Sequence, residues 1–157
     1  MTDYKAPLRD IRFVADELWD YDKHYQSLSG TEDVNSELRD AILEEAAKFA
    51  EQVIAPLRRS GDEEGCTWSE DGVTTPSGFK EAYKQFIDGG WCGLSMPEEF
   101  GGQALPASLE LMTSELIAEA NHSCPSGGAN RHTALYTVAE VTFRKRSSIS
   151  SDTCVGI

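Results

Sequence analysis

The sequence predicts an all-α fold, an antiparallel helical bundle with an irregular C-terminal tail. Apolar residues recur every three or four positions in four separate segments, which is the spacing of one helix face. The joins between these segments are short and rich in glycine, proline and polar residues, as expected between antiparallel neighbours. A chain of 157 residues can bury about two-thirds of its unfolded surface, so a core without disulfides or metals is expected.

The first helix is predicted from Pro7 to Leu18, since proline is tolerated in the first turn of a helix. We expect this helix to pack against its neighbours rather than to take part in chemistry. A polar stretch at residues 27–34 then interrupts the helical pattern. The apolar residues of this first helix are Leu8, Ile11, Phe13, Val14 and Leu18.

A long second helix is predicted to start at Asn35 or Ser36, either of which can cap it, and to run to about Arg59. Pro56 should bend this helix or end it early. Two lines of apolar residues form a stripe too wide for one neighbour, so we expect a helix that lies between others and an apolar surface that promotes association. The lines are Leu38, Ile42, Ala46, Phe49, Val53 and Leu57, and Leu43, Ala47, Ala50 and Ile54.

Residues 60–77 are acidic and rich in small polar residues, with Trp68 as the only large apolar side chain. This composition indicates a surface excursion or a short hairpin. A third helix is predicted from about Gly78 to Asp88 and a fourth from about Ala107 to Ala120. The glycine-rich loop at residues 89–102 joins them.

The chain after residue 120 has a different composition, with more serine, threonine and glycine and few acidic residues. Its β-branched and aromatic stretch at residues 135–143 predicts one strand, which has no partner strand in the tail. We therefore divide the chain into a helical domain at residues 1–124 and an irregular tail at residues 125–157. We expect that this tail is not the segment that normally follows such a helical domain.

The charge of the chain excludes nucleic acid as a partner. Residues 1–120 carry 25 acidic and 10 basic side chains, and the whole chain has a formal net charge of −13. Such a body repels nucleic acids and anionic membranes. No apolar run approaches the roughly 20 residues that span a bilayer, so no membrane span is predicted.

Cysteine and histidine usage predicts a cytoplasmic chain without a metal site. The four cysteines are far apart, with no Cys-x-x-Cys pair, and no signal-peptide segment opens the chain, which favours reduced thiols. His122 and Cys124 lie two positions apart, but no second pair completes four ligands. The sequence also lacks a Walker loop, a dinucleotide-binding glycine motif and a nucleophile elbow. The cysteines are Cys66, Cys92, Cys124 and Cys154.

Two segments carry a family resemblance. The loop Gly93-Leu-Ser-Met-Pro-Glu-Glu-Phe-Gly-Gly102 resembles one near the end of the N-terminal helical domain of acyl-CoA dehydrogenases. The segment Tyr4-Lys-Ala-Pro-Leu-Arg-Asp-Ile-Arg-Phe-Val14 is similar to the start of the longer members of that family, which include methylthiopropanoyl-CoA dehydrogenases. The likeness extends from about Tyr4 to Cys124 and then fades.

The resemblance implies a fold, a reaction and partners. Family members continue with a β-rich middle domain and a C-terminal helical domain, which provide most flavin contacts and the catalytic glutamate. The implied reaction is the α,β-dehydrogenation of acyl-CoA thioesters by FAD, with electrons leaving through an electron-transfer flavoprotein, in a homo-oligomer. Because this chain lacks both later domains, we expect it to hold no FAD by itself and to contain no catalytic residue.

The resemblance also assigns two site residues on the fourth helix. Glu115 matches a helix glutamate that lies near the floor of the acyl pocket in the family, and Met112 comes one turn earlier. Alternatively, Met112 packs in the core and Glu115 is an exposed charge on the helix surface. The paired Glu98 and Glu99 of the glycine loop are expected to be solvated or capping groups rather than an acid–base pair.

The sequence thus predicts the N-terminal domain, a fragment, of an FAD-dependent acyl-CoA dehydrogenase. The alternative is a non-enzymatic helical interaction module that binds a protein through the surface the later domains would cover. Reading the DNA beyond codon 124 in all three frames distinguishes them. A middle domain encoded in another frame would identify the tail as a frameshift product.

Overall fold

The computed structural model describes residues 4–122, which lie in one compact unit. These residues form a helical bundle with one small hairpin, so the predicted all-α fold is confirmed. The elements are α1 (Leu8–Arg12), η1 (Phe13–Leu18), α2 (Tyr21–Gln26), α3 (Ser36–Phe49), η2 (Ala50–Ile54), α4 (Leu57–Glu64), β1 (Thr67–Ser69), β2 (Gly72–Thr74), α5 (Phe79–Asp88), η3 (Trp91–Gly93), η4 (Glu98–Phe100) and α6 (Ala107–Ala120).

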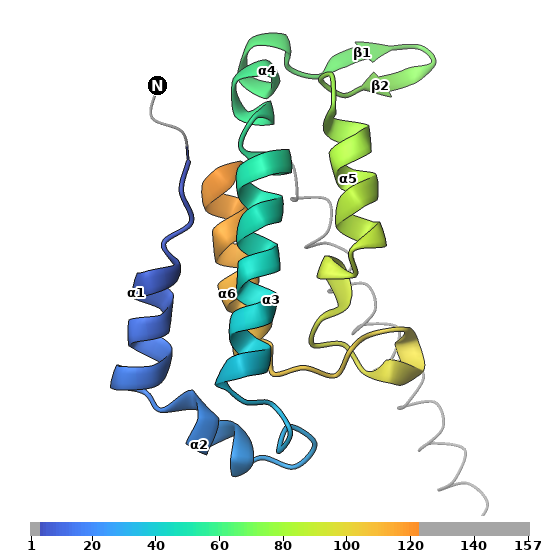
Figure 1. Cartoon of the computed structure of the whole chain (residues 1–157). Helices are drawn as coiled ribbons and strands as arrows, with labels where there is room; N and C mark the ends of the chain where they lie inside the picture. The colour runs from blue at the N-terminus through green and yellow to red at the C-terminus, as the bar shows by residue number, and fades with distance from the viewer. Residues whose placement is uncertain (1–3, 123–157) are drawn as a thin grey trace, which may run out of the picture. The chain divides into compact units, whose positions relative to one another are not determined.

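Helix α3 and its continuation η2 form the centre of the bundle (Figure 1). In that view α1 and α5 run downward while α3 and α6 run upward, so these helices alternate in direction along the chain. Helix α6 packs along α3 and η2, and α1 packs on α3 from another side. The wide apolar stripe of the long helix is used by several neighbours, as its sequence predicts. Two buried clusters make the core: Ala15, Leu43, Ala46, Ala47, Leu109, Met112 and Leu116, and Ala50, Ile54, Ala82, Phe86, Ile117 and Ala120.

The long helix begins as predicted but does not end as predicted. Asn35 caps it by accepting a hydrogen bond from the Leu38 N–H at 2.9 Å. The helix then widens into the π-helical η2 and turns at Pro56, where the missing N–H of proline interrupts the ladder. Helix α4 follows and continues to Glu64, five residues beyond the predicted end at Arg59. An exposed ion pair between Arg59 and Glu63, 2.7 Å long, supports this extra turn.

The segment before α3 contains a helix that the sequence pattern did not predict. The predicted helix from Pro7 to Leu18 is present as α1 and the π-helical η1, which closes with a bond from the Trp19 N–H to the Val14 carbonyl at 3.1 Å. Helix α2 then begins at the cap Asp20 and spans six residues. Its fully buried Tyr25 is the main apolar anchor, and a helix this short shows no repeating apolar face.

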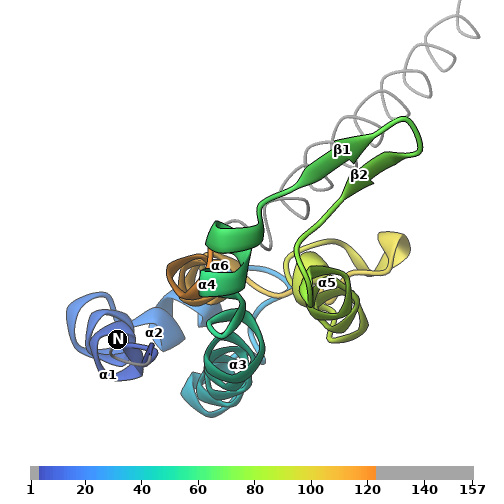
Figure 2. The ribbon, with the colours of Figure 1, turned by 90° about the horizontal axis from the view of Figure 1, so that it is seen from above.

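The acidic stretch at residues 60–77 contains a short hairpin after α4, which is one of the two structures predicted from its composition. Strands β1 and β2 are antiparallel and pair Trp68 with Val73. Both side chains are exposed, and the hairpin extends away from the helices (Figure 2). Helices α5 and α6 match the predicted third and fourth helices to within one residue. The strand predicted at residues 135–143 lies outside the described residues.

Within residues 4–122, no helix has both the length and the apolar character needed to cross a membrane. Among the same residues Cys66 and Cys92 are free thiols.

Asn35→Ala should lower the free energy of unfolding by about 1 kcal/mol, because the N–H of Leu38 loses its cap. Urea denaturation followed by circular dichroism measures this change. Asn35→Asp, which keeps an accepting oxygen, is the matched control and should stay close to the wild type. Equal losses in the two variants would show that the side-chain oxygen does not cap α3.

Candidate functional site

The glycine-rich loop between α5 and α6 folds back on itself. Backbone N–H groups of Gln103, Ala104 and Leu105 donate to the carbonyls of Gly93, Met96 and Leu94 at 3.0, 2.9 and 2.8 Å. These bonds pair residues 93–96 with residues 103–105. The loop therefore delivers the start of α6 in a fixed position.

Glycines make this closed loop possible in two ways. Gly90 and Gly101 have φ of 73° and 80°, a left-handed conformation that disfavours side chains. Of the two glycines that follow α5, Gly90 adopts this conformation, while Gly89 keeps a helical φ of −76°. At Gly102 the requirement is space, because a Cβ atom there would lie 2.0 Å from the carbonyl oxygen of Met96.

Helix α6 is held in place by polar contacts along its length. At its start the Ser108 and Tyr25 hydroxyls are 2.7 Å apart. Two residues further along, the Glu110 carboxylate accepts hydrogen bonds from the Ser95 N–H and hydroxyl. Near its end the Tyr4 hydroxyl donates to the Leu116 carbonyl at 3.0 Å and also contacts Glu119. Burial, and then the Glu119 carboxylate, raise the pKa of Tyr4 well above its ordinary value, so this hydroxyl stays protonated as a donor.

One face of α6 remains uncovered by the described residues. Leu111 is 69% exposed, although it lies in a helix whose other large apolar side chains are buried. Three of its neighbours along this face are alanine or serine, which leave the backbone open to close approach. We call this surface the open face of α6; it consists of Ala107, Leu111, Ser114, Glu115 and Ala118.

The structure places the two residues proposed from the sequence on different sides of α6. Glu115 is exposed and belongs to the open face. Met112 is 9% exposed and packs in the core cluster with Leu43 and Ala46. Leu111, which the sequence analysis did not single out, takes the exposed position beside Glu115. Its signal was present in the sequence, since α6 is apolar around most of its circumference and such a helix is normally covered on all sides.

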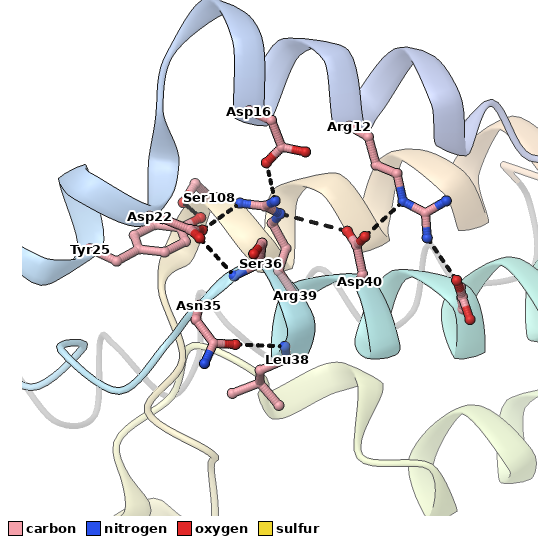
Figure 3. Close-up of polar contacts among 11 residues, drawn as sticks. Arg12, Asp16, Asp22, Tyr25, Asn35, Ser36, Leu38, Arg39, Asp40 and Ser108 are labelled. Carbon is pink, nitrogen blue, oxygen red and sulfur yellow. Dashed lines mark hydrogen bonds and ion pairs between the residues drawn. The ribbon is translucent and has the colours of Figure 1, made fainter.

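The largest polar cluster of the described residues centres on Arg39, whose side chain is fully buried. Its guanidinium forms ion pairs with Asp16 of η1 and with Asp22 of α2, the latter at 3.0 Å (Figure 3). Asp40 is shared with Arg12, whose Nε lies 3.0 Å from its carboxylate. The cluster fastens η1 and α2 to α3, and it is structural because each carboxylate already faces a guanidinium. Its members were not predicted, since only the fold brings residues 12, 16, 22 and 39 together.

The chain ahead of α1 is fixed by Glu51 of η2. Its carboxylate accepts hydrogen bonds from the Lys5 ammonium at 2.9 Å and from the Ala6 N–H at 3.0 Å. These two bonds, the first contributing more, lower the pKa of Glu51.

The stabilising effect of Glu51 should depend on pH. A carboxyl whose folded pKa is lowered contributes stability above its ordinary pKa of 4.5 and loses it as the pH falls through the folded value. Glu51→Gln should therefore be less stable than the wild type at pH 7, and the difference should shrink toward pH 3. Urea midpoints at several pH values measure it. A difference that stays constant over this range would contradict the assigned bonds.

The other polar groups that the structure describes include the loop carboxylates and the lining of a surface hollow. No cluster of three or more His, Cys, Asp or Glu residues among the described residues could hold a metal ion. Glu98 and Glu99 are both exposed, as expected for solvated groups. An open hollow of about 700 Å³ between α4 and the end of α6 has a lining of mixed charge, which selects neither an anion nor a cation. It is lined by Arg58, Arg59, Gly61, Asp62, Glu63, Ala118, Glu119, Asn121 and His122.

Comparison with known proteins gives two findings. A family model described as the acyl-CoA dehydrogenase N-terminal domain matches residues 36–142. The 3-methylmercaptopropionyl-CoA dehydrogenase of Ruegeria pomeroyi is 37% identical over 125 residues, which are 78% of this chain and 21% of that protein. The chain thus spans about a fifth of the length of this curated relative. The family match runs past residue 124, where the resemblance in the sequence was expected to fade, and the domain boundary there stays a prediction.

Proposed function

Since this chain belongs to the acyl-CoA dehydrogenase family and carries its N-terminal domain, we propose that the open face of α6 forms one wall of an acyl-CoA site. The whole enzyme of which this is the N-terminal domain would desaturate an acyl-CoA thioester with FAD as cofactor. Its further partner would be an electron-transfer flavoprotein.

The observation that carries this proposal is the open face itself. Leu111 is 69% exposed on a helix that otherwise supplies the core, and alanines and a serine surround it. A surface of this kind suits close contact with an apolar chain or another domain. Glu115 would lie at this wall, and Met112 would support it from the core side. The bonds to Tyr25, Ser95 and Tyr4 hold the helix that carries the wall, which is the rigidity a binding surface needs.

The glycine-rich loop does not fit the phosphate groups of a flavin cofactor. A glycine-rich loop that binds phosphate offers free backbone N–H groups. In this loop the N–H groups of residues 100–105 all donate to carbonyls of the loop itself. The closed loop sets the position of α6 and leaves no cradle for a phosphate. We therefore assign one wall of the acyl-CoA site to this domain, and we assign the flavin contacts to segments beyond residue 122.

A chimera tests the proposed wall. Residues 4–122 would replace the matching segment of the Ruegeria pomeroyi dehydrogenase, and turnover of its thioester would be followed with an artificial electron acceptor. Leu111→Trp in the chimera should raise KM by about tenfold or more, because the indole enters the space of the acyl chain. Leu38→Trp, also at an exposed leucine but on α3, is the matched control and should leave KM unchanged.

Two results would contradict the wall. One is a chimera that binds flavin and has the same KM for the thioester with and without Leu111→Trp. The other is an equal rise of KM in the Leu38→Trp control. Thermal unfolding of the isolated chain separates site effects from folding effects, since both exposed substitutions should leave its Tm within a few degrees of the wild type.

The purified chain itself should be colourless and inactive. The reason is that the backbone N–H groups of the closed loop already donate to its own carbonyls, and that the family resemblance assigns most flavin contacts and the catalytic glutamate to later domains. An absorption spectrum of the purified chain and an assay with acyl-CoA thioesters measure this. A flavin band that co-purifies with the chain, or turnover above background, would contradict the assignment of the flavin to later segments.

A further inference from the structure

The outer surface of η1 exposes several large apolar side chains next to one another in sequence. Phe13, Leu18 and Trp19 are 52%, 60% and 63% exposed, and Val14 adjoins them. Both views place α1, which leads directly into η1, at the outer edge of the bundle (Figures 1 and 2). A small domain rarely leaves such a group of apolar residues to water without a partner.

The inner surface of the same segment is already occupied. Ala15 is fully buried in the core cluster, and Ile11 packs against that cluster. Arg12 forms ion pairs with Asp40 and Glu44 of α3 at 3.0 and 2.7 Å. The exposed side is therefore held outward by contacts on the opposite side, and it is a fixed surface rather than a loose end.

Charges lie in order along this outer surface. Arg9, Phe13 and Glu17 are spaced four residues apart, so they fall close to one line along α1 and η1, and all three are exposed. Neither Arg9 nor Glu17 has an ion-pair partner among residues 4–122. The line thus presents a positive end, an aromatic centre and a negative end. Val14 and Leu18 lie beside it, with Asp10 at its edge.

A surface with this order is complementary to itself. We propose that the outer surface of α1 and η1, made of Arg9, Phe13, Val14, Glu17, Leu18 and Trp19, binds the same surface of a second copy of this chain. The two helices would run antiparallel about a two-fold axis at Phe13. Arg9 of each copy then meets Glu17 of the other, and the apolar side chains bury one another between these pairs. The order of the charges favours a second copy over an unrelated partner, because a single two-fold rotation pairs Arg9 with Glu17 at both ends of the contact.

This inference goes beyond the proposed function and does not depend on it. The surface lies ahead of residue 36, where the match to the family model begins. It is also formed by other elements than the open face of α6. An experiment can therefore disprove the dimer without affecting the proposed acyl-CoA wall, and it can disprove the wall without affecting the dimer.

Sedimentation velocity of the full chain tests the dimer, over about 1 to 200 μM because a small contact gives weak association. The wild type should show a reversible monomer–dimer equilibrium. Phe13→Asp should raise the dissociation constant at least about tenfold, since it removes the centre of the contact. Arg9→Glu and Glu17→Arg should each weaken the dimer as well, because the symmetry makes each change act at both ends. The double variant Arg9→Glu with Glu17→Arg restores opposite charges and should recover the wild-type constant to within about threefold.

Phe100→Asp is the matched control, since Phe100 is 46% exposed on η4, away from this surface. It should leave the dissociation constant unchanged. A wild type that stays monomeric, or a control that weakens association as much as Phe13→Asp, would overturn the proposal. So would a charge-swapped double variant that fails to recover the dimer, because the occupant of this surface would then be another segment or another protein. Circular dichroism of each variant confirms that the helices are retained.

Discussion

Arg39→Met should lower the free energy of unfolding by about 3 kcal/mol or more. The substitution keeps much of the apolar length of the side chain but removes the buried guanidinium that Asp16, Asp22 and Asp40 share. Breaking a buried ion pair from one side leaves the opposite charges uncompensated, and that loss exceeds the loss of an exposed pair several-fold. The segments η1 and α2 would lose their attachment to α3. Urea denaturation at pH 7, followed by circular dichroism, measures the change.

Two further variants make this prediction specific. Arg59→Met removes an exposed pair with Glu63 and should cost only about 0.5 kcal/mol. Arg39→Lys should recover part of the stability, since one ammonium cannot reach Asp16 and Asp22 with the geometry of a guanidinium. If Arg39→Met and Arg59→Met unfold at the same urea concentration, the cluster does not hold the N-terminal segment in place.

Gly102→Ala should lower the free energy of unfolding by about 3 kcal/mol. The added methyl group would lie 2.0 Å from the Met96 carbonyl oxygen and 2.5 Å from its Cβ, so backbone must move. Moving it disturbs the bonds that pair residues 93–96 with residues 103–105, and with them the start of α6. The same urea experiment measures the loss.

Gly93→Ala is the control in the same loop. A Cβ atom there would meet its nearest neighbour, the Cα of Gly102, at an ordinary 3.6 Å. We expect its cost to be about 1 kcal/mol or less. A loss for Gly93→Ala equal to that for Gly102→Ala would mean that crowding against Met96 is not what requires glycine at position 102.

The helices and their order could be predicted because their signals are local. Apolar spacing gave α5 and α6 to within a residue, and Asn35 marked the start of α3 through its cap. Pro56 interrupted the long helix as its missing donor requires. Helix α2 escaped prediction because six residues with one buried tyrosine show no period. The extension of α4 to Glu64 was not predicted either, because its polar residues are typical of a loop.

The sequence by itself determined the helical class, the position of the glycine-rich loop and the family, because spacing, capping and turn residues act over a few neighbouring positions. Only the tertiary structure decided which side of α6 is covered. It buried Met112 in the core and left Leu111 and Glu115 outside, since packing against α3 and η2 fixes the rotation of the helix. Only the fold, likewise, brought Asp16 and Asp22 to Arg39 across 23 and 17 positions of the chain. Burial and long-range pairing depend on how elements meet, and that information is not contained in any single segment.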